Sequence, residues 1–471
     1  MAIQTIDPTS NKVVKTFEAL SKAQTENRLQ LARDAFKKWR DVTLNDRSVL
    51  MRKCADILLD DKDRYASLMT LEMGKPVREA RAEIEKCASV CLYYADNAQD
   101  FLKNEPAKTD AHESYVRFDP LGTVLAIMPW NFPFWQVFRF AAPTLMAGNT
   151  GLLKHASNVP QCALAIEEVF TKAGFAEGIF QTLLVESDAV EAIINDNRVQ
   201  AVTLTGSEGA GAKVGAQAGK ALKKTVLELG GSDAFIVLQD ANLDAAAKTA
   251  AKSRMINTGQ SCIAAKRFIV AEQIAEEFTE KMKRHMLALQ PGDLQNEVTD
   301  YGPMAREDLA EELLKQVQKS VDKGAKIICG GNRPGKPGAY FNPTILANVT
   351  PGMPAFDEEM FGPVAAIITA NSEQHAIELA NQSCYGLGAS VWTENTARAQ
   401  EMARQIEAGA VFINALVKSD PRMPFGGIKR SGYGRELSYF GIREFVNQKT
   451  VWVDEAAKSD VANKPVNEIT E

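Results

Sequence analysis

A cysteine with small and polar neighbours is the first residue in this sequence that could do chemistry. Cys262 ends the stretch Asn-Thr-Gly-Gln-Ser-Cys, in which Gly259 breaks any helix that precedes it. These neighbours suit an exposed thiol, which attacks as its thiolate, and local dipoles can lower its pKa. The alternative is a buried cysteine that packs as a small apolar group. The hexapeptide therefore indicates a nucleophile but does not decide between the two.

An acid and an amide are candidates to assist such a nucleophile. Glu228 follows Val226 and Leu227, which predicts that it ends a strand. The carboxyl ends of parallel strands are where open α/β sheets bind ligands, and burial there would raise the pKa of a carboxyl toward that of a general base. Asn131 stands between two prolines, so its amide is a candidate donor to an oxyanion. A solvated carboxylate and a turn-forming asparagine are the alternatives.

A glycine-containing turn could approach a phosphate group. Gly206 and Ser207 close a predicted strand, and Gly209 and Gly211 follow in the next turn. Glycines at the N-terminus of a helix let the backbone come close to a pyrophosphate. The spacing matches neither the dinucleotide fingerprint nor the P-loop, so this signal is weak by itself.

Short apolar runs that alternate with helical stretches must position these residues. The alternation predicts an α/β fold of two doubly wound parallel-sheet halves, hinged near residues 229–231. The predicted strands are 124–128, 151–154, 180–184, 201–205, 235–238, 267–270, 327–328, 365–369 and 411–414. The predicted helices include 24–60, 76–102, 163–170, 274–289, 305–323, 373–382 and 396–407.

Composition excludes several classes of protein. The 471 residues are 45% hydrophobic and 24% charged, with a net charge of −6 and no basic run, so we expect no nucleic-acid partner. No apolar stretch is long enough for a membrane helix, and the N-terminus has no apolar leader. The seven cysteines form no CxxC pair, which indicates no metal site and a cytoplasmic protein with reduced thiols.

Six motifs in a fixed order carry a family resemblance. They are PWNFP at 129–133, TGS at 205–207, LELGG at 227–231, NTGQSC at 257–262, EEMFGPV at 358–364 and PFGGIKRSG at 424–432. From about residue 5 to residue 455 the chain resembles the aldehyde dehydrogenase superfamily, whose members oxidise aldehydes with NAD or NADP.

The resemblance implies a domain organisation. It implies a Rossmann-like cofactor-binding domain at 1–102 and 121–229 and a catalytic domain at 230–446. A β oligomerisation arm is expected at 103–120 and 447–455, followed by a loose tail at 456–471. A homodimer or a homotetramer built from dimers is the expected assembly.

The resemblance also implies a role for each candidate residue. Cys262 would form a thiohemiacetal and then a thioester, Asn131 would hold the oxyanion with the backbone N–H of Cys262, and Glu228 would activate water. The positions that match cofactor contacts are Trp130, Lys154, Gly206, Ser207, Glu359 and Phe361.

One departure from the family pattern concerns the cofactor. Many NAD-using relatives carry glutamate three residues after the lysine, and this chain has Ser157 there. Serine removes a carboxylate that would repel a 2′-phosphate, and Lys154 with Ser157 could hold that phosphate. We therefore predict that NADP is accepted, with room for a preference over NAD; the alternative is that Ser157 is neutral and both NADP and NAD bind.

Arg139 and Ser419 indicate the substrate class. Succinate-semialdehyde dehydrogenases resemble this chain at both positions, which implies a short aldehyde with a distal carboxylate. An arginine that lies along a helix face is the alternative for Arg139. These relatives often carry a further arginine where this chain has Ile256, which indicates looser specificity. A broad-specificity aliphatic or aromatic aldehyde dehydrogenase, an enzyme that makes acyl-CoA and an inactive structural homologue are the rival interpretations.

Overall fold

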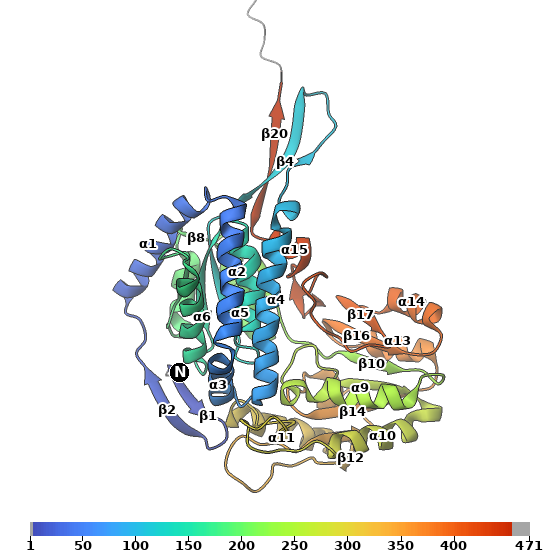
Figure 1. Ribbon diagram of the computed structural model, residues 1–471. Coiled ribbons are helices and arrows are strands. Elements are labelled where there is room, and N and C mark those ends of the chain that lie inside the picture. The colour runs from blue at the N-terminus through green and yellow to red at the C-terminus, as the bar shows by residue number, and fades with distance from the viewer. Residues whose placement is uncertain (1–2, 455–471) are drawn as a thin grey trace, which may run out of the picture.

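The structure is a computed structural model that describes residues 3–454 (Figure 1). Its first sheet has six strands in the order β19-β9-β8-β5-β6-β7. All neighbours are parallel except β19 and β9. The strands are β5 (Thr123–Met128), β6 (Thr150–His155), β7 (Phe180–Thr182), β8 (Val199–Thr205), β9 (Lys224–Glu228) and β19 (Gly432–Tyr433).

The strand order creates a crevice at the carboxyl edge of this sheet. From β5 the chain runs outward to β6 and β7, then returns to place β8 on the other side of β5, followed by β9. The reversal between β5 and β8 is a topological switch point, where open α/β sheets bind ligands. Asn131, Lys154, Ser207 and Glu228 lie at or just beyond the carboxyl ends of these strands.

Helices cover both faces of the first sheet, as continuous apolar strands require. On β5, Val124 and Ala126 belong to one core and Leu125 to the other, which is the period-two alternation of a strand. The first core includes α2 (Leu44–Asp60), α3 (Lys62–Met73), α4 (Val77–Phe101), α5 (Trp135–Met146) and α6 (Pro160–Ala173). The second includes α1 (Lys22–Trp39), α7 (Val190–Asn195) and α8 (Glu208–Lys220).

The second sheet has seven strands in the order β12-β13-β14-β11-β10-β16-β17. Only β12 and β13 pair antiparallel among its neighbours. The strands are β10 (Ala234–Val237), β11 (Arg267–Ala271), β12 (Lys326–Cys329), β13 (Thr344–Ala347), β14 (Val364–Ala370), β16 (Gly388–Trp392) and β17 (Ala410–Ile413). One face packs on α9 (Leu243–Met255) and α10 (Ala275–Leu287), the other on α11 (Glu307–Asp322), α12 (Pro354–Asp357), α13 (Glu373–Asn381) and α14 (Thr396–Gln405).

A three-stranded arm projects from the body (Figure 1). Strand β20 (Val446–Val453) pairs antiparallel with β4 (Glu113–Pro120) along its whole length, and β3 (Glu105–Pro106) pairs with the other side of β4. Because β20 lies at the edge of this small sheet, its outer backbone groups are unpaired by strands in residues 3–454. The remaining strands and α-helix are β1 (Ile3–Asp7), β2 (Lys12–Phe17), β15 (Tyr385–Gly386), β18 (Ile428–Lys429) and α15 (Ser438–Ile442).

The predicted α/β class with two doubly wound sheets is confirmed, and every predicted strand overlaps an observed one. The sequence interpretation missed α3, α9, β13, β16 and the β1–β2 hairpin. The range 230–446, predicted as one catalytic domain, also contributes β19 to the first sheet. Residue 455 of the predicted arm and the predicted tail 456–471 lie outside the described residues.

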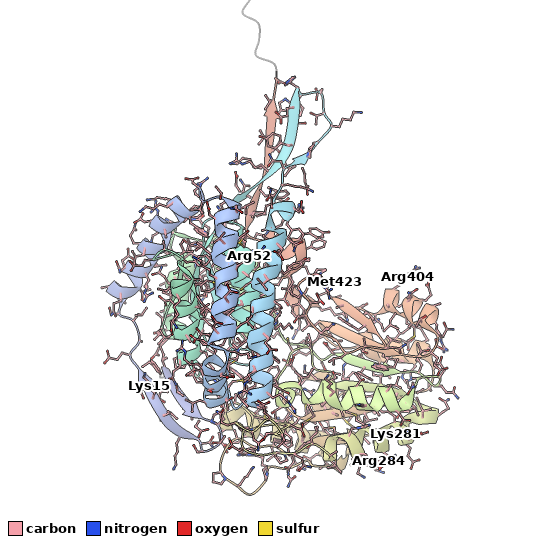
Figure 2. All side chains as sticks on the ribbon, in the orientation of Figure 1. Lys15, Arg52, Lys281, Arg284, Arg404 and Met423 are labelled. Atoms are coloured by element: carbon pink, nitrogen blue, oxygen red, sulfur yellow. The ribbon has the colours of Figure 1, made fainter. Side chains whose placement is uncertain are left out.

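The outer surface carries many charged side chains. Figure 2 shows Lys281, Arg284 and Arg404 at the periphery of the second sheet's helices, away from the junction with the first sheet. Within residues 3–454, no helix combines the length and apolar character needed to cross a membrane. The same residues contain no cluster of His, Cys, Asp and Glu that could bind a metal ion.

Candidate active site

The loop that carries Cys262 is tightly constrained. Asn257 and Thr258 adopt left-handed φ angles of 53° and 54°, and Gly259 follows at 78°. A Cβ on Gly259 would lie 2.2 Å from the carbonyl oxygen of Gly362, so only glycine fits there. Strain of this kind at consecutive residues persists only where the surroundings enforce it, which is typical of functional loops.

Lys266 anchors the backbone of this loop through hydrogen bonds. It is fully buried, and its Nζ donates to the carbonyl oxygens of Ser261 and Cys262, both at 2.9 Å, and of Ala264 at 3.2 Å. It also forms an ion pair with Glu359 at 3.4 Å. Lys266 therefore connects the nucleophile loop to a predicted cofactor contact, a link that no local sequence pattern indicates.

The surroundings of Cys262 favour the neutral thiol over the thiolate. Burial raises the pKa of the thiol to about 12, although Arg139 and Lys266 oppose the shift. Because only the thiolate attacks readily, the thiol proton must leave as the reaction begins. The site therefore needs a base close to Cys262 or water that reaches it.

Asn131 contacts the nucleophile loop directly. Its side-chain Nδ2 donates to the backbone carbonyl oxygen of Gln260 at 3.1 Å. Its backbone carbonyl oxygen accepts from Asn257 Nδ2 at 2.7 Å. An amide nitrogen has two N–H groups, so one remains for a ligand. Asn131 and Cys262 line the same cavity, an arrangement that suits the predicted oxyanion donor.

A buried ion pair supports the Asn131 loop. Lys75 and Glu83 form a salt bridge with side chains 0% and 2% exposed, and Lys75 Nζ also donates to the Asn131 carbonyl oxygen at 3.1 Å. Glu83 Oε1 accepts from the backbone N–H groups of Phe134 and Trp135, both at 2.9 Å, where α5 begins. This pair therefore holds the loop and helix that carry the amide.

Replacing Lys75 with methionine should destabilise the protein. Loss of one partner leaves a buried carboxylate uncompensated, which costs about 3 kcal/mol in the free energy of unfolding. Denaturant unfolding of the purified variant measures this. The double variant Lys75→Met with Glu83→Gln should recover part of the loss, because the amide oxygen still accepts from α5. Equal loss in the two variants would show that the pair is not coupled.

Glu228 is buried at the end of β9 and is 2% exposed. Neither of its carboxylate oxygens has a hydrogen-bond partner among the described residues. Burial raises its pKa well above the ordinary value, and the nearby Glu436 carboxyl adds to the shift, while Arg139 and Arg435 oppose it. A carboxyl with a raised pKa and free oxygens suits proton transfer.

Two cavities meet at Cys262. The cofactor-side cavity, about 250 Å³, is lined by Trp130, Asn131, Gly206, Ser207, Glu359, Phe361 and Cys262, among others. The substrate-side cavity, about 270 Å³, is lined by Trp135, Arg139, Ile256, Ser419, Phe425 and Cys262, among others. Cys262 and Gln136 line both, so a group in either cavity can reach the nucleophile loop. Glu228 lines neither.

The cofactor-side cavity fits a dinucleotide. Ser207 caps the N-terminus of α8, its hydroxyl accepting from Ala210 N–H at 3.4 Å, and a Cβ on Gly209 would meet nothing within 4 Å. This open helix N-terminus suits a phosphate. Lys154, at the end of β6, has no ion-pair partner among the described residues; Lys154 and Ser157 lie outside the set that lines the cavity.

Arg139 lies on the wall of the substrate-side cavity, but its charge is paired with a carboxylate of the protein. The guanidinium forms an ion pair with Glu436, lies 4.5 Å from the Phe425 ring centroid and donates to Thr205 Oγ1 at 3.4 Å. The sequence could not indicate this pairing, because Glu436 is far along the chain. Carboxylate binding by Arg139 and Ser419 stays a prediction.

Comparisons with known proteins agree with this geometry. The chain matches the aldehyde dehydrogenase family over residues 1–451. It is 54% identical to a Synechocystis protein named "Probable succinate-semialdehyde dehydrogenase [NADP(+)]", over 96% of this chain and 100% of the relative. It is 50% identical to a Mycobacterium bovis protein named succinate-semialdehyde dehydrogenase [NADP(+)] 1, with the same coverage.

A solved structure supports the same grouping. The succinic semialdehyde dehydrogenase of Streptococcus pyogenes, crystallised with NADP+ as the cofactor, superposes with a TM-score of 0.94 at 41% identity. The superposition covers 96% of this chain and 100% of that one. With a constrained cysteine between two cavities and a family match along nearly its whole length, the chain belongs to the aldehyde dehydrogenase family.

Proposed function

We propose that this chain oxidises succinate semialdehyde to succinate and that NADP+ accepts the hydride. The observation that carries the proposal is the place of Cys262, which lines both cavities. One cavity has the residues for a dinucleotide, and the other combines apolar walls with cationic groups, which suits a short aldehyde with a distal carboxylate. The names of the relatives support the same substrate and cofactor.

The proposed reaction uses Cys262 as a covalent catalyst. The Cys262 thiol gives its proton to water as its sulfur bonds to the aldehyde carbon, and the developing oxyanion accepts a hydrogen bond from the Asn131 amide. Bound NADP+ supplies the oxidising power by accepting the hydride from that carbon. Glu228 then takes a proton from the water that attacks the thioester. The C–S bond breaks to release the carboxylic acid, which ionises, and the departing sulfur takes up the proton from Glu228 to restore the Cys262 thiol.

We propose that Ser207, Gly206 and the N-terminus of α8 bind the pyrophosphate, and that Glu359 and Phe361 contact the nicotinamide half. Lys154 and Ser157 are the proposed contacts of the 2′-phosphate. The backbone of Ser157 is held in place, because its carbonyl oxygen accepts from Gln4 N–H at 3.1 Å. Its hydroxyl forms no hydrogen bond among the described residues and is available to the phosphate.

Replacing Ser157 with glutamate should disfavour NADP+. The new carboxylate would face the 2′-phosphate, and juxtaposed like charges cost several kcal/mol, so the KM for NADP+ should rise about 100-fold. The KM for NAD+ should stay within a few-fold of the wild-type value. Steady-state rates with each cofactor measure this, with Ser157→Ala as the control for loss of the hydroxyl. An unchanged KM for NADP+ in Ser157→Glu would remove Ser157 from the site.

Initial rates test the proposed function directly. The purified chain is given succinate semialdehyde or butanal, a neutral four-carbon aldehyde, with NADP+ or NAD+ at equal concentration. The proposal predicts the highest kcat/KM for succinate semialdehyde with NADP+. Equal kcat/KM for the two aldehydes would discard the substrate and keep aldehyde oxidation, while turnover that requires added CoA would discard hydrolysis by Glu228.

We further propose a homo-oligomer, a dimer or a tetramer, assembled in the cytoplasm. The edge strand β20 supports the oligomer, because its outer side is available for pairing and Trp452 on it is 48% exposed. The seven cysteines, all free thiols, are consistent with a reducing compartment. Light scattering on the purified chain tests the assembly, and a monomeric mass would contradict it.

A further inference from the structure

The substrate-side cavity contains a lysine whose charge no described carboxylate pairs with. Arg139 on its wall is paired with Glu436, and Lys418 is exposed. Lys86, on α4, faces the cavity without an ion pair to any acidic residue in 3–454. Lys86 is half-buried, and a cation held at a cavity wall without a paired carboxylate favours an anionic ligand there.

The surroundings of Lys86 orient its ammonium group. Its Nζ donates to Ser419 Oγ at 2.6 Å and lies 4.1 Å from the centroid of the Trp135 ring. These two contacts leave further N–H groups on the ammonium for another acceptor. Because the Ser419 oxygen accepts from the lysine, its own O–H can donate to the same acceptor. One cation beside one hydroxyl donor matches the two oxygens of a carboxylate.

We infer that Lys86 and Ser419 together bind the distal carboxylate of the aldehyde substrate. The inference rests on the proposed function and assigns the anchor to Lys86 rather than to Arg139. Cys262 lines the same cavity, so a short chain can place its aldehyde carbon at the sulfur while its carboxylate lies at Lys86.

The paired state of Arg139 supports this division of roles. Its Nε forms the ion pair with Glu436 and its Nη2 donates to Thr205, so a carboxylate already compensates its charge, although N–H groups remain on the guanidinium. A substrate carboxylate at Arg139 would share the guanidinium with Glu436, a buried carboxyl, and the two like charges would repel each other. Lys86 gives up no carboxylate when it binds an anion.

The charge of Lys86 is expected to depend on pH near neutrality. Burial lowers its pKa to about 8, and Arg139 on α5 lowers it further, while Glu83 and Cys87 on α4 and Asp420 beyond Ser419 oppose the shift. Lys86 is therefore cationic at pH 7 and becomes neutral as the pH rises through about 8. The KM for succinate semialdehyde should rise over that range, whereas the KM for butanal should not.

The test compares Lys86→Met, Lys86→Arg and Ser419→Ala with the wild-type enzyme on both aldehydes. In Lys86→Met the KM for succinate semialdehyde should rise about 10- to 100-fold, the range for loss of a charged hydrogen bond, while kcat/KM for butanal changes little. Lys86→Arg should keep the KM within a few-fold and move its rise to higher pH. Lys53→Met, which removes an exposed lysine on α2 outside both cavities, is the control and should change neither substrate.

The outcomes separate the anchor from the proposed function. If the wild-type enzyme favours succinate semialdehyde and Lys86→Met keeps that preference, the anchor is overturned and the function stands. An equal rise of KM in Lys53→Met would show a general effect of surface charge rather than a site, and would also overturn the anchor. If the wild-type enzyme treats the two aldehydes alike, both inferences fail. Turnover of butanal by Lys86→Met establishes that the variant is folded.

Discussion

Replacing Cys262 with alanine should abolish aldehyde oxidation, with kcat lowered about 10⁵-fold or more, as for loss of other catalytic nucleophiles. Without the sulfur no covalent intermediate forms, and the oxyanion donor and the cofactor cannot replace it. Formation of reduced cofactor at saturating substrate measures the loss. Because Cys262 is partly exposed at the junction of two cavities and alanine removes only the sulfur, the variant should fold.

Two controls make this result specific. Titration with NADPH should give a Kd within a few-fold of the wild-type value, because alanine leaves Trp130, Ser207 and Glu359 in place. Cys384→Ser removes another accessible thiol outside both cavities and should leave kcat unchanged. Several per cent of wild-type activity in Cys262→Ala would exclude covalent catalysis by this residue.

Replacing Glu228 with glutamine should separate the two halves of the reaction. The first half needs the sulfur and the cofactor, whereas hydrolysis of the thioester needs a base. We therefore expect a burst of about one equivalent of reduced cofactor per site, followed by a steady-state rate about 10²- to 10⁴-fold lower, the usual effect of general-base loss. Stopped-flow absorbance resolves both phases.

The pH dependence gives a second readout for Glu228. Burial and the Glu436 carboxyl raise the pKa of Glu228, so at neutral pH a larger fraction holds its proton than for an ordinary glutamate. Only the deprotonated form accepts a proton from water. The wild-type steady-state rate should therefore rise with pH on a limb above the ordinary glutamate value, and Glu228→Gln should lack that limb.

Glu72 offers a matched control for these effects. It is also fully buried with a raised pKa, caused first by burial, but it accepts hydrogen bonds from Thr5 and the backbone of Cys162, outside both cavities. Glu72→Gln should show neither a burst nor a changed pH limb. If Glu228→Gln slowed the burst and the steady state equally, Glu228 would act in the first half, most simply as the base for Cys262.

Much of the fold could be predicted because strands buried on both faces of a parallel sheet consist almost entirely of apolar residues. β5, β8, β11 and β14 are short apolar runs with both faces in a core, and each was predicted. β16, with the sequence Gly-Ala-Ser-Val-Trp, has little strand propensity of its own and forms by pairing with β10 and β17. The alanine-rich α9 was missed because small residues give a weak periodic pattern.

The sequence by itself determined the family and the α/β class and named Cys262, Glu228 and Asn131 as the candidate reacting groups, because the motifs around them are local and specific. Only the tertiary structure decided which contacts position the polar side chains of the site and which way their pKa values shift. Lys86 meets Ser419 across 333 residues, and Arg139 meets Glu436 from a different segment of the chain. Burial and pairing set the pKa of a side chain, and both arise only when distant segments pack together.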